Sequence, residues 1–229
     1  MIKKLVAIGL FFTVGTTLSI HLLFDVPDSF DERLLLYKDS WYIFSKWVTV
    51  VHCILVLMGM VAICSELKKY HEVSYTLGVI GYTGFSFFEI YRQLSVIFYL
   101  NPLREHYIYA ETLEEKFFLE RQIDLFPQAS SGVFATFILF FALGNVFTGL
   151  LFLKEKAKLN TIIGIGLLIW AFTGMLVLLN QHWNIEIINS FLDVFNYTFQ
   201  PAARLLLGIW LWERVTKNES FSTQVYSFK

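Results

Sequence analysis

The sequence predicts an all-α membrane protein: a bundle of six transmembrane helices with short interfacial helices on the outer side. Hydrophobic residues make up 56% of the 229 positions and charged residues only 16%, whereas a soluble domain carries about 25% charged residues. Six apolar stretches are each long enough to cross a bilayer, which takes about 20 residues. We therefore expect residues 1–229 to form a single transmembrane domain.

The six predicted spans follow one another along the whole chain. The first, 5–24, comes after Lys3 and Lys4. Its apolar run is longer than that of a signal peptide and no small-residue cleavage site follows, so we expect an uncleaved helix. The last span is the least regular, because Pro201 and Arg204 interrupt its apolar run. The four spans between them cover residues 41–64, 73–100, 132–153 and 159–179. The irregular last span covers residues 196–212.

The connections between the spans are of two kinds. Residues 65–72 and 154–158 are short, which predicts antiparallel helix hairpins. The connection 101–131 is long, and within it the run from Thr112 to Glu115 matches a helix capping box. We expect a short amphipathic helix lying on the outer surface there, and a second one at 184–195.

The distribution of Lys and Arg predicts that both termini lie in the cytoplasm, because cytoplasmic flanks are rich in basic residues. One side of the predicted topology collects Lys3, Lys4, Lys68, Lys69, Lys154, Lys156, Lys158, Arg214, Lys217 and Lys229. The other side collects Arg33, Lys38, Arg104, Lys116 and Arg121 among many acidic residues.

The third span contains three polar residues at membrane depth. Glu89, Arg92 and Gln93 are spaced i, i+3, i+4, which places them on one face of a helix. Ionisable groups at this depth cost at least a few kcal/mol each, so they usually face a partner or a cavity. This group is the strongest functional feature of the sequence.

Two further polar residues fall at a similar depth in other spans. With a helical rise of about 1.5 Å per residue, Arg92 and Arg204 each lie about 12 Å inward from the outer end of their span, and His52 lies close to that level. Two arginines and one glutamate leave positive charge, which favours a carboxylate, a phosphate head group or chloride as ligand. Alternatively, Glu89 bridges both arginines and only holds the third and sixth helices in register.

Small residues mark positions where helices approach closely. Gly78, Gly81 and Gly84 recur at every third position of the third span, and Asn145 lies among small residues in the fourth. Glycines permit close contact between membrane helices, and an asparagine can donate a hydrogen bond across such a contact. We expect these four residues to serve helix packing.

No motif of a known enzyme class is present, so we expect neither catalysis nor a metal or other cofactor. Cys53 and Cys64 lie eleven positions apart on one predicted helix, too far for a disulfide. His52 is at mid-membrane depth whereas His21 and His182 are near the outer ends, which disfavours haem ligation by a histidine pair. The net charge of −1 gives no field directed at nucleic acid.

Two segments of the second half resemble a bacterial family of six-helix membrane proteins, domain of unknown function 4386. They are the hairpin 150–169 (LLFLKEKAKLNTIIGIGLLI) and the run 201–212 (PAARLLLGIWLW). The resemblance implies a six-helix protein of the bacterial inner (plasma) membrane, and it assigns neither an activity nor site residues.

Two function classes therefore remain. The first is an accessory or assembly subunit of a membrane complex, whose partner is another membrane protein or a second copy of the chain. The second is a small transporter, channel or receptor-like protein that binds an anionic small molecule or lipid at Glu89, Arg92 and Arg204. Both classes have the lipid bilayer as their surroundings, and neither involves nucleic acid.

Overall fold

The computed structural model describes residues 2–22, 27–183 and 185–227, and every regular element in these ranges is helical, which confirms the predicted all-α class. The elements are α1 (Ile2–Leu22), α2 (Phe30–Leu34), η1 (Leu35–Lys38), α3 (Ser40–Leu67), η2 (Lys68–Tyr70), α4 (Glu72–Ser95), η3 (Val96–Leu100), α5 (Asn101–Tyr109), α6 (Leu113–Lys154), α7 (Lys158–Trp183) and α8 (Glu186–Ser227).

Capping residues set the starts of two long helices, α3 and α4. Asp39 accepts hydrogen bonds from the backbone N–H groups of Trp41 and Tyr42 at 2.8 and 3.0 Å and begins α3. His71 Nδ1 accepts from the Ser74 N–H at 3.1 Å and begins α4. These caps satisfy N–H groups that have no partner within the helix, so each helix begins directly after its polar turn residue.

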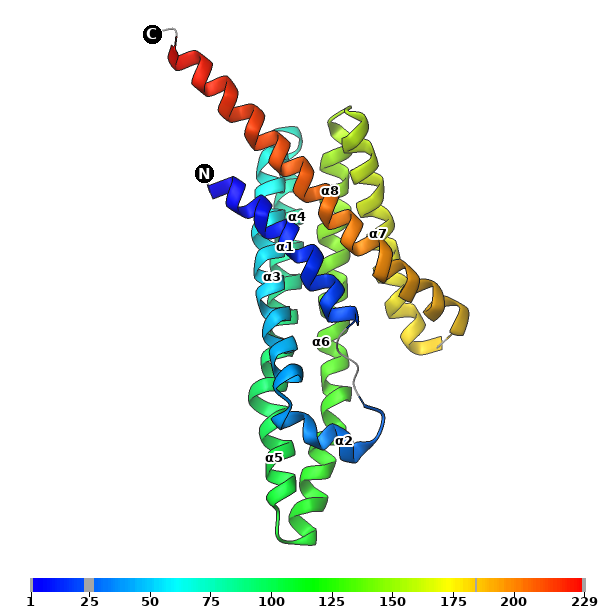
Figure 1. The fold of residues 1–229 in the computed structure, drawn as a ribbon. Helices are drawn as coiled ribbons and strands as arrows, with labels where there is room; N and C mark the ends of the chain where they lie inside the picture. The colour runs from blue at the N-terminus through cyan, green and yellow to red at the C-terminus, as the bar shows by residue number, and fades with distance from the viewer. Residues whose placement is uncertain (1, 23–26, 184, 228–229) are drawn as a thin grey trace.

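The long helices form a bundle in which α3, α4 and α6 run side by side, while α1 and α8 cross them obliquely (Figure 1). Helix α4 packs between α3 and α6, α7 packs on α6, and α1 packs on α8 and α3. The start of α1, the end of α8, the α3–α4 turn and the α6–α7 turn all lie toward the upper end in Figure 1, and the α5–α6 turn lies at the lower end. This arrangement places the basic flanks predicted to be cytoplasmic at one end of the bundle.

Four helices among the described residues are long and apolar enough to cross a membrane: α1, α3 with η2, α6 and α7. The sequence also predicts spans at 73–100 and 196–212. Both segments are helical, but the first belongs to α4 and η3 and the second to α8, and neither segment reaches the same hydropathy. The fold therefore has the character of an integral membrane protein.

The predicted long outer loop at 101–131 is wrong. Helix α4 continues through the π-helical turn η3 into α5, and α6 then begins at Leu113 and runs unbroken to Lys154. Thr112 Oγ1 does accept a hydrogen bond from the Glu115 N–H at 3.2 Å, as a capping residue should. The helix it begins is the second arm of a long hairpin with α5, instead of a short helix lying on the surface.

Pro102 and Pro127 bracket the segment 101–131, and packing explains why neither ends a helix. Pro102 falls in the first turn of α5, directly after the π turn, where a missing N–H is tolerated. Pro127 lies inside α6, four residues after Ile123. Ile123 is buried in a small core with Tyr42, Val96 and Leu100. Burial of this apolar face maintains α6 despite the hydrogen bond that Pro127 cannot make.

The second predicted surface helix, 184–195, is also wrong as a separate element. From Glu186 onward this segment forms the first turns of α8, which continues through Pro201 to Ser227. Two short helices that were not predicted, α2 and η1, lie instead between α1 and α3. Ser29 begins α2 by accepting a hydrogen bond from the Glu32 N–H at 3.2 Å.

Candidate functional site

The bundle encloses a pocket of about 280 Å³. Helices α1, α3, α4, α6, α7 and α8 each contribute side chains to it. Its polar lining includes Thr17, Thr49, His52, Glu89, Arg92 and Arg204, and its aromatic lining consists of Phe85, Phe134, Phe137, Phe141 and Trp170. Four of the five residues predicted as a ligand or ion-pair group thus line one pocket, and Gln93 lies directly behind it.

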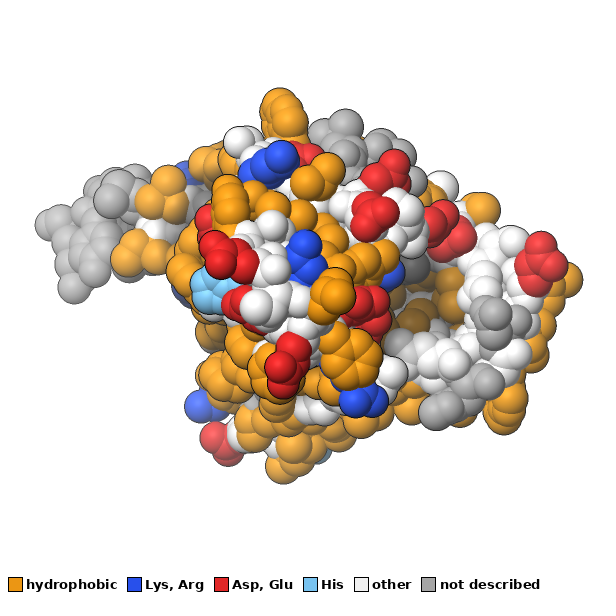
Figure 2. Space-filling model, turned by 90° about the horizontal axis from the view of Figure 1, so that it is seen from below, with side chains coloured by type: hydrophobic (Ala, Val, Ile, Leu, Met, Phe, Trp, Pro, Cys, Tyr) orange, Lys and Arg blue, Asp and Glu red, His pale blue; other side chains and the backbone are white. Residues whose placement is uncertain are grey.

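The face seen from below is hollowed between the tip of the α5–α6 hairpin and the α7–α8 corner, and orange apolar side chains line the hollow (Figure 2). Thr49, Arg92 and Gln200 are the lining residues of α3, α4 and α8 that lie nearest to this end of the bundle, as the direction of each helix shows. The pocket lining on α1 and α4 thus falls toward the helix ends that lie away from the basic flanks.

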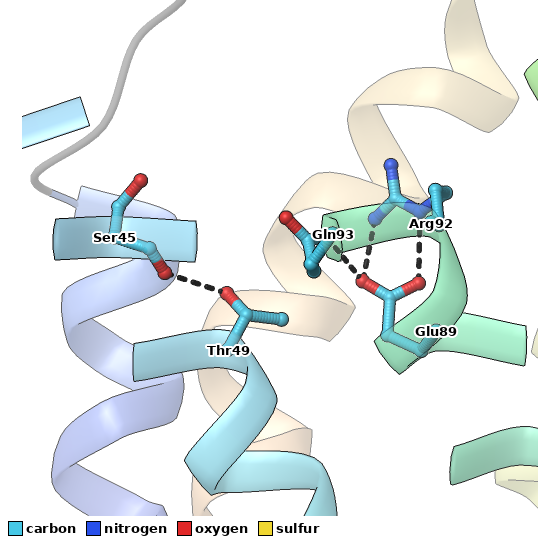
Figure 3. A network of polar contacts seen from close by, with 5 residues as sticks. All are labelled: Ser45, Thr49, Glu89, Arg92 and Gln93. Atoms are coloured by element: carbon cyan, nitrogen blue, oxygen red, sulfur yellow. Dashed lines mark hydrogen bonds and ion pairs between the residues drawn. The ribbon is translucent and has the colours of Figure 1, made fainter. Parts of the chain in front are cut away.

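The three polar residues of α4 form a self-contained cluster. Arg92 Nε and Nη2 donate to the two carboxylate oxygens of Glu89 at 2.8 and 2.6 Å. Gln93 Nε2 donates to Glu89 Oε1 at 2.6 Å. Figure 3 shows the Glu89 carboxylate lying between the Arg92 guanidinium and the Gln93 amide. Glu89 is buried, whereas 34% of the Arg92 side chain is exposed.

The predicted bridge from Glu89 to both arginines is wrong. Both oxygens of the Glu89 carboxylate already bond within α4, because Arg92 and Gln93 follow it by three and four positions on the same face. Among the residues that the structure describes, no ion pair joins α4 to Arg204 on α8. The cluster therefore does not hold these two helices in register.

Arg204 is the exceptional group of the pocket. It is 5% exposed, and its guanidinium lies over the Trp170 ring, with Cζ 5.5 Å from the ring centroid. Its buried Nε has no hydrogen-bond partner, and within the described ranges the guanidinium makes no ion pair. An arginine carries five N–H donors and keeps its charge in proteins. A charged donor group is thus buried beside the pocket without an anionic partner from the described chain.

His52 contributes a polar side chain to the pocket from α3. Its Nδ1 lies 2.7 Å from Thr16 Oγ1 on α1, and the ring is buried. The hydroxyl and the ring nitrogen can exchange donor and acceptor roles, since they depend on the tautomer. This contact connects α1 to α3 beside the pocket.

The glycines and Asn145 lie at the α4–α6 contact, next to the pocket. A Cβ at Gly81 would collide with the backbone of Gly144 and stand 2.9 Å from the Phe140 carbonyl oxygen. Tyr82 Oη donates to Asn145 Oδ1 at 2.6 Å across the same contact. The other two predicted packing glycines face α6 as well, Gly78 toward Thr148 and Gly84 toward Phe140. This close approach brings the Glu89 face of α4 to the aromatic residues of α6.

The aromatic wall of the pocket was not predicted from the sequence. Phe85 stacks on Phe137 with ring centroids 4.9 Å apart and contacts Phe141 at 5.1 Å. Phe141 in turn meets Trp170 edge to face at 5.0 Å. The spacing of Phe134, Phe137 and Phe141 places them on one face of a helix and was a usable signal.

Among the described side chains, no three from His, Cys, Asp and Glu come together as a metal site. No protein-family model, curated protein sequence or solved structure matches the chain. The geometry of the pocket is therefore the basis for the functional interpretation.

Proposed function

We propose that this chain is a six-span membrane protein that binds a small anion in the central pocket, as a transporter, channel or receptor-like protein. The observation that carries the proposal is Arg204, a buried cation that lines the pocket without a counter-ion from the described chain. The charge of Arg92 is already balanced by Glu89. An anion in the pocket would supply the partner that Arg204 lacks.

The outward faces of α4 and α8 support the inclusion of both helices as spans. Ile80 and Phe87 of α4 and Leu205 and Ile209 of α8 are exposed large apolar residues. The polar residues that lower the hydropathy of these helices, above all Glu89 and Arg204, are buried inside. Membrane helices with polar residues turned inward and apolar residues turned toward lipid have this distribution.

The proposed topology places both termini in the cytoplasm, in a bacterial inner membrane. Basic residues at the starts and turns on one end support it, by the rule that cytoplasmic flanks are basic. Labelling of single cysteines at Lys69 and Lys156 with a membrane-impermeant reagent tests it, since both should react from the same side. The native Cys53 and Cys64 are buried and should add little background. Reaction from opposite sides would overturn the topology.

A melting series on the purified full-length protein tests anion binding. Chloride, phosphate, acetate and an anionic lipid are added separately to the parent, to Arg204→Gln and to Arg121→Gln. Arg121 lies on the exposed face of the α5–α6 hairpin and serves as the matched control. At least one anion should raise the melting temperature of the parent and the control, and none should raise that of Arg204→Gln.

The behaviour of Arg204→Gln without added anion separates the two roles of Arg204. Removing a buried charge that has no partner should leave the stability unchanged or increase it, because the charge itself is costly to bury. A structural arginine would instead destabilise the fold when replaced. If Arg204→Gln melts well below the parent and the parent ignores every anion, the pocket has no binding role.

A second candidate function, an accessory subunit, is favoured by the α5–α6 hairpin. Helix α6 has 42 residues and is about 63 Å long, roughly twice the hydrocarbon thickness of a bilayer, so the hairpin projects beyond it. Its tip exposes Tyr109, Leu113, Phe117 and Phe118. If this tip docks a partner, a photo-crosslinking amino acid introduced in place of Phe117 should capture one protein in stoichiometric amount in native membranes. Capture of many unrelated proteins would argue against a docking role of the tip.

A further inference from the structure

We infer that the ligand of the pocket is a small amphiphilic monoanion, with one carboxylate head at Arg204 and an aliphatic or aromatic body against the aromatic wall. This inference rests on the proposed anion pocket and adds the chemical class of its ligand. Four observations support it: the Arg204 guanidinium, which makes no ion pair within the described residues, the net charge of the lining, the aromatic wall and the volume.

The head group follows from the geometry of Arg204. Its Nε is buried without a hydrogen-bond partner, and its guanidinium lies against Trp170 at the pocket wall. A guanidinium also presents its two Nη groups side by side as a planar fork, which matches the two oxygens of a carboxylate without using the shielded Nε. Stacking on Trp170 restricts the plane of this fork, so less freedom is lost when an anion binds.

The net charge of the pocket lining favours a ligand with a single negative charge. Among the described lining residues the ionised groups are Glu89, Arg92 and Arg204. Glu89 and Arg92 neutralise each other through two hydrogen bonds, which leaves one positive charge. Helix α3 carries one Lys or Arg, which is Lys46. Its Nζ lies 4.4 Å from the centroid of the Tyr42 ring, and the residue does not line the pocket. A dianion such as phosphate would bring a second negative charge into a low-dielectric site without a partner.

The body of the ligand follows from the rest of the wall. Phe85, Phe137, Phe141 and Trp170 form a continuous aromatic surface through the ring contacts described above. Burial of apolar surface against such rings contributes about 25 cal/mol per Å². Chloride and phosphate use none of this surface. A pocket with an apolar wall and a few polar groups is typical of sites that orient an amphiphilic small molecule.

The volume limits the size of the ligand. A space of about 280 Å³ corresponds to roughly nine water molecules at about 30 Å³ each, and so to a ligand with on the order of ten non-hydrogen atoms. An aromatic acid or a medium-chain fatty acid has this size, whereas a diacyl phospholipid is far larger. The acid can come from the aqueous phase or, as a free fatty acid, from the bilayer.

The experiment measures binding to the purified full-length protein with four kinds of probe. Benzoate and octanoate have both the head and the body, acetate has the head alone, benzyl alcohol has the body alone, and chloride and phosphate have neither a carboxylate nor a body. Benzoate or octanoate should bind at least about tenfold more tightly than acetate, a difference of about 1.4 kcal/mol. Benzyl alcohol should not compete with them.

Two variants check the contacts. Arg204→Lys keeps the charge but loses the fork, so it should weaken benzoate binding about tenfold or more. Gly174→Ala adds a methyl group at the pocket, where a Cβ would stand an ordinary 3.5 Å from Ile138 and 3.9 Å from Phe141. This change should preserve the fold, weaken octanoate and benzoate binding, and leave acetate binding unchanged. Arg121→Gln serves again as the control.

The outcomes distinguish this inference from the proposed function. If phosphate or chloride binds as tightly as benzoate and Arg204 is required, anion binding stands and the amphiphilic class is wrong. Equal competition by benzyl alcohol would overturn the carboxylate head. If no anion binds, the proposed function itself fails. Preference for octanoate over benzoate would favour a fatty acid from the bilayer as the source, and the reverse order would favour a water-soluble aromatic acid. Tighter binding of palmitate than of either would contradict the size limit set by the pocket volume.

Discussion

The Glu89 cluster gives the most direct test of whether the pocket is shielded from water. Glu89→Gln removes the only anion in the described pocket lining and leaves Arg92 without its charge partner. The introduced amide can still accept a hydrogen bond from Arg92 or Gln93, so the change is nearly isosteric. Any large effect must therefore come from charge, and its size reports the effective polarity of the site.

The expected magnitude follows from the contacts. Glu89 accepts two hydrogen bonds from Arg92, at 2.8 and 2.6 Å, and bonds to charged groups contribute about 1.5–3 kcal/mol each. Breaking a fully buried pair costs about 3–5 kcal/mol. Because the Arg92 side chain is 34% exposed, part of its charge is solvated, and we expect a loss of about 3 kcal/mol. For a chain of this size that corresponds to melting about 6–12 °C lower.

The assay is thermal unfolding of the purified protein, with one control on the same helix. Glu72 begins α4 and lies 3.6 Å from Lys68, but it is 78% exposed. Such a surface pair contributes about 0–1 kcal/mol, so Glu72→Gln should change the melting temperature little. The double variant Glu89→Gln with Arg92→Gln should recover much of the loss, since it removes the unpaired charge. Equal melting of the two single variants would refute the reasoning and place the Glu89 cluster in water.

Two further predictions concern the framework around the pocket. Gly81→Ala places a Cβ against the backbone of Gly144 and should cost about 1–3 kcal/mol of stability. The control Gly132→Ala, with nothing within 4 Å of its Cβ, should have the melting temperature of the parent or a higher one. Equal melting temperatures of the two variants would disprove the close contact. At the α6–α7 turn, burial raises the pKa of Glu155, but hydrogen bonds led by that from Arg214 outweigh it and hold the pKa below the ordinary 4.5. This carboxylate therefore stabilises the fold fully above about pH 4.5 and loses its contribution as the pH falls through the lowered pKa. The melting temperature of Glu155→Gln should lie below that of the parent at pH 7, and this difference should disappear on strong acidification. A difference in melting temperature that does not depend on pH would contradict this reasoning.

The sequence allowed the depth of the pocket residues to be predicted, but not their direction around each helix axis. A fixed rise per residue and the need to span the bilayer place Arg92, Arg204 and His52 at one level, and the structure lines one pocket with all three. Whether Glu89 turns toward Arg92 or Arg204 depends on helix rotation and side-chain packing. The i, i+3 spacing within α4 decided that question, since Arg92 reaches both oxygens of the carboxylate.

The length of the helices was harder to predict, because the strongest local signals opposed the tertiary contacts. Pro102 and Pro127 bracket the segment predicted as a loop, and Pro201 interrupts the apolar run of the last predicted span. In the structure one lies in a first helical turn, and the other two lie within helices. A proline removes one hydrogen bond, whereas the apolar face that continues past it packs over many residues. Contacts such as that of Ile123 with the core around Tyr42 cannot be derived from a local pattern.

The stability cost of Arg204 is itself an argument for a binding role. A subunit that serves assembly alone would be more stable with an apolar residue at this position, since a buried charge without a partner opposes folding. A ligand that binds only the folded protein returns stability in proportion to its concentration, about 2.7 kcal/mol at a hundredfold excess over Kd. Because α1, α3, α4, α6, α7 and α8 all line the pocket, an anion at Arg204 would stabilise the bundle as a whole. The same guanidinium that weakens the unliganded fold would then make the liganded fold more stable.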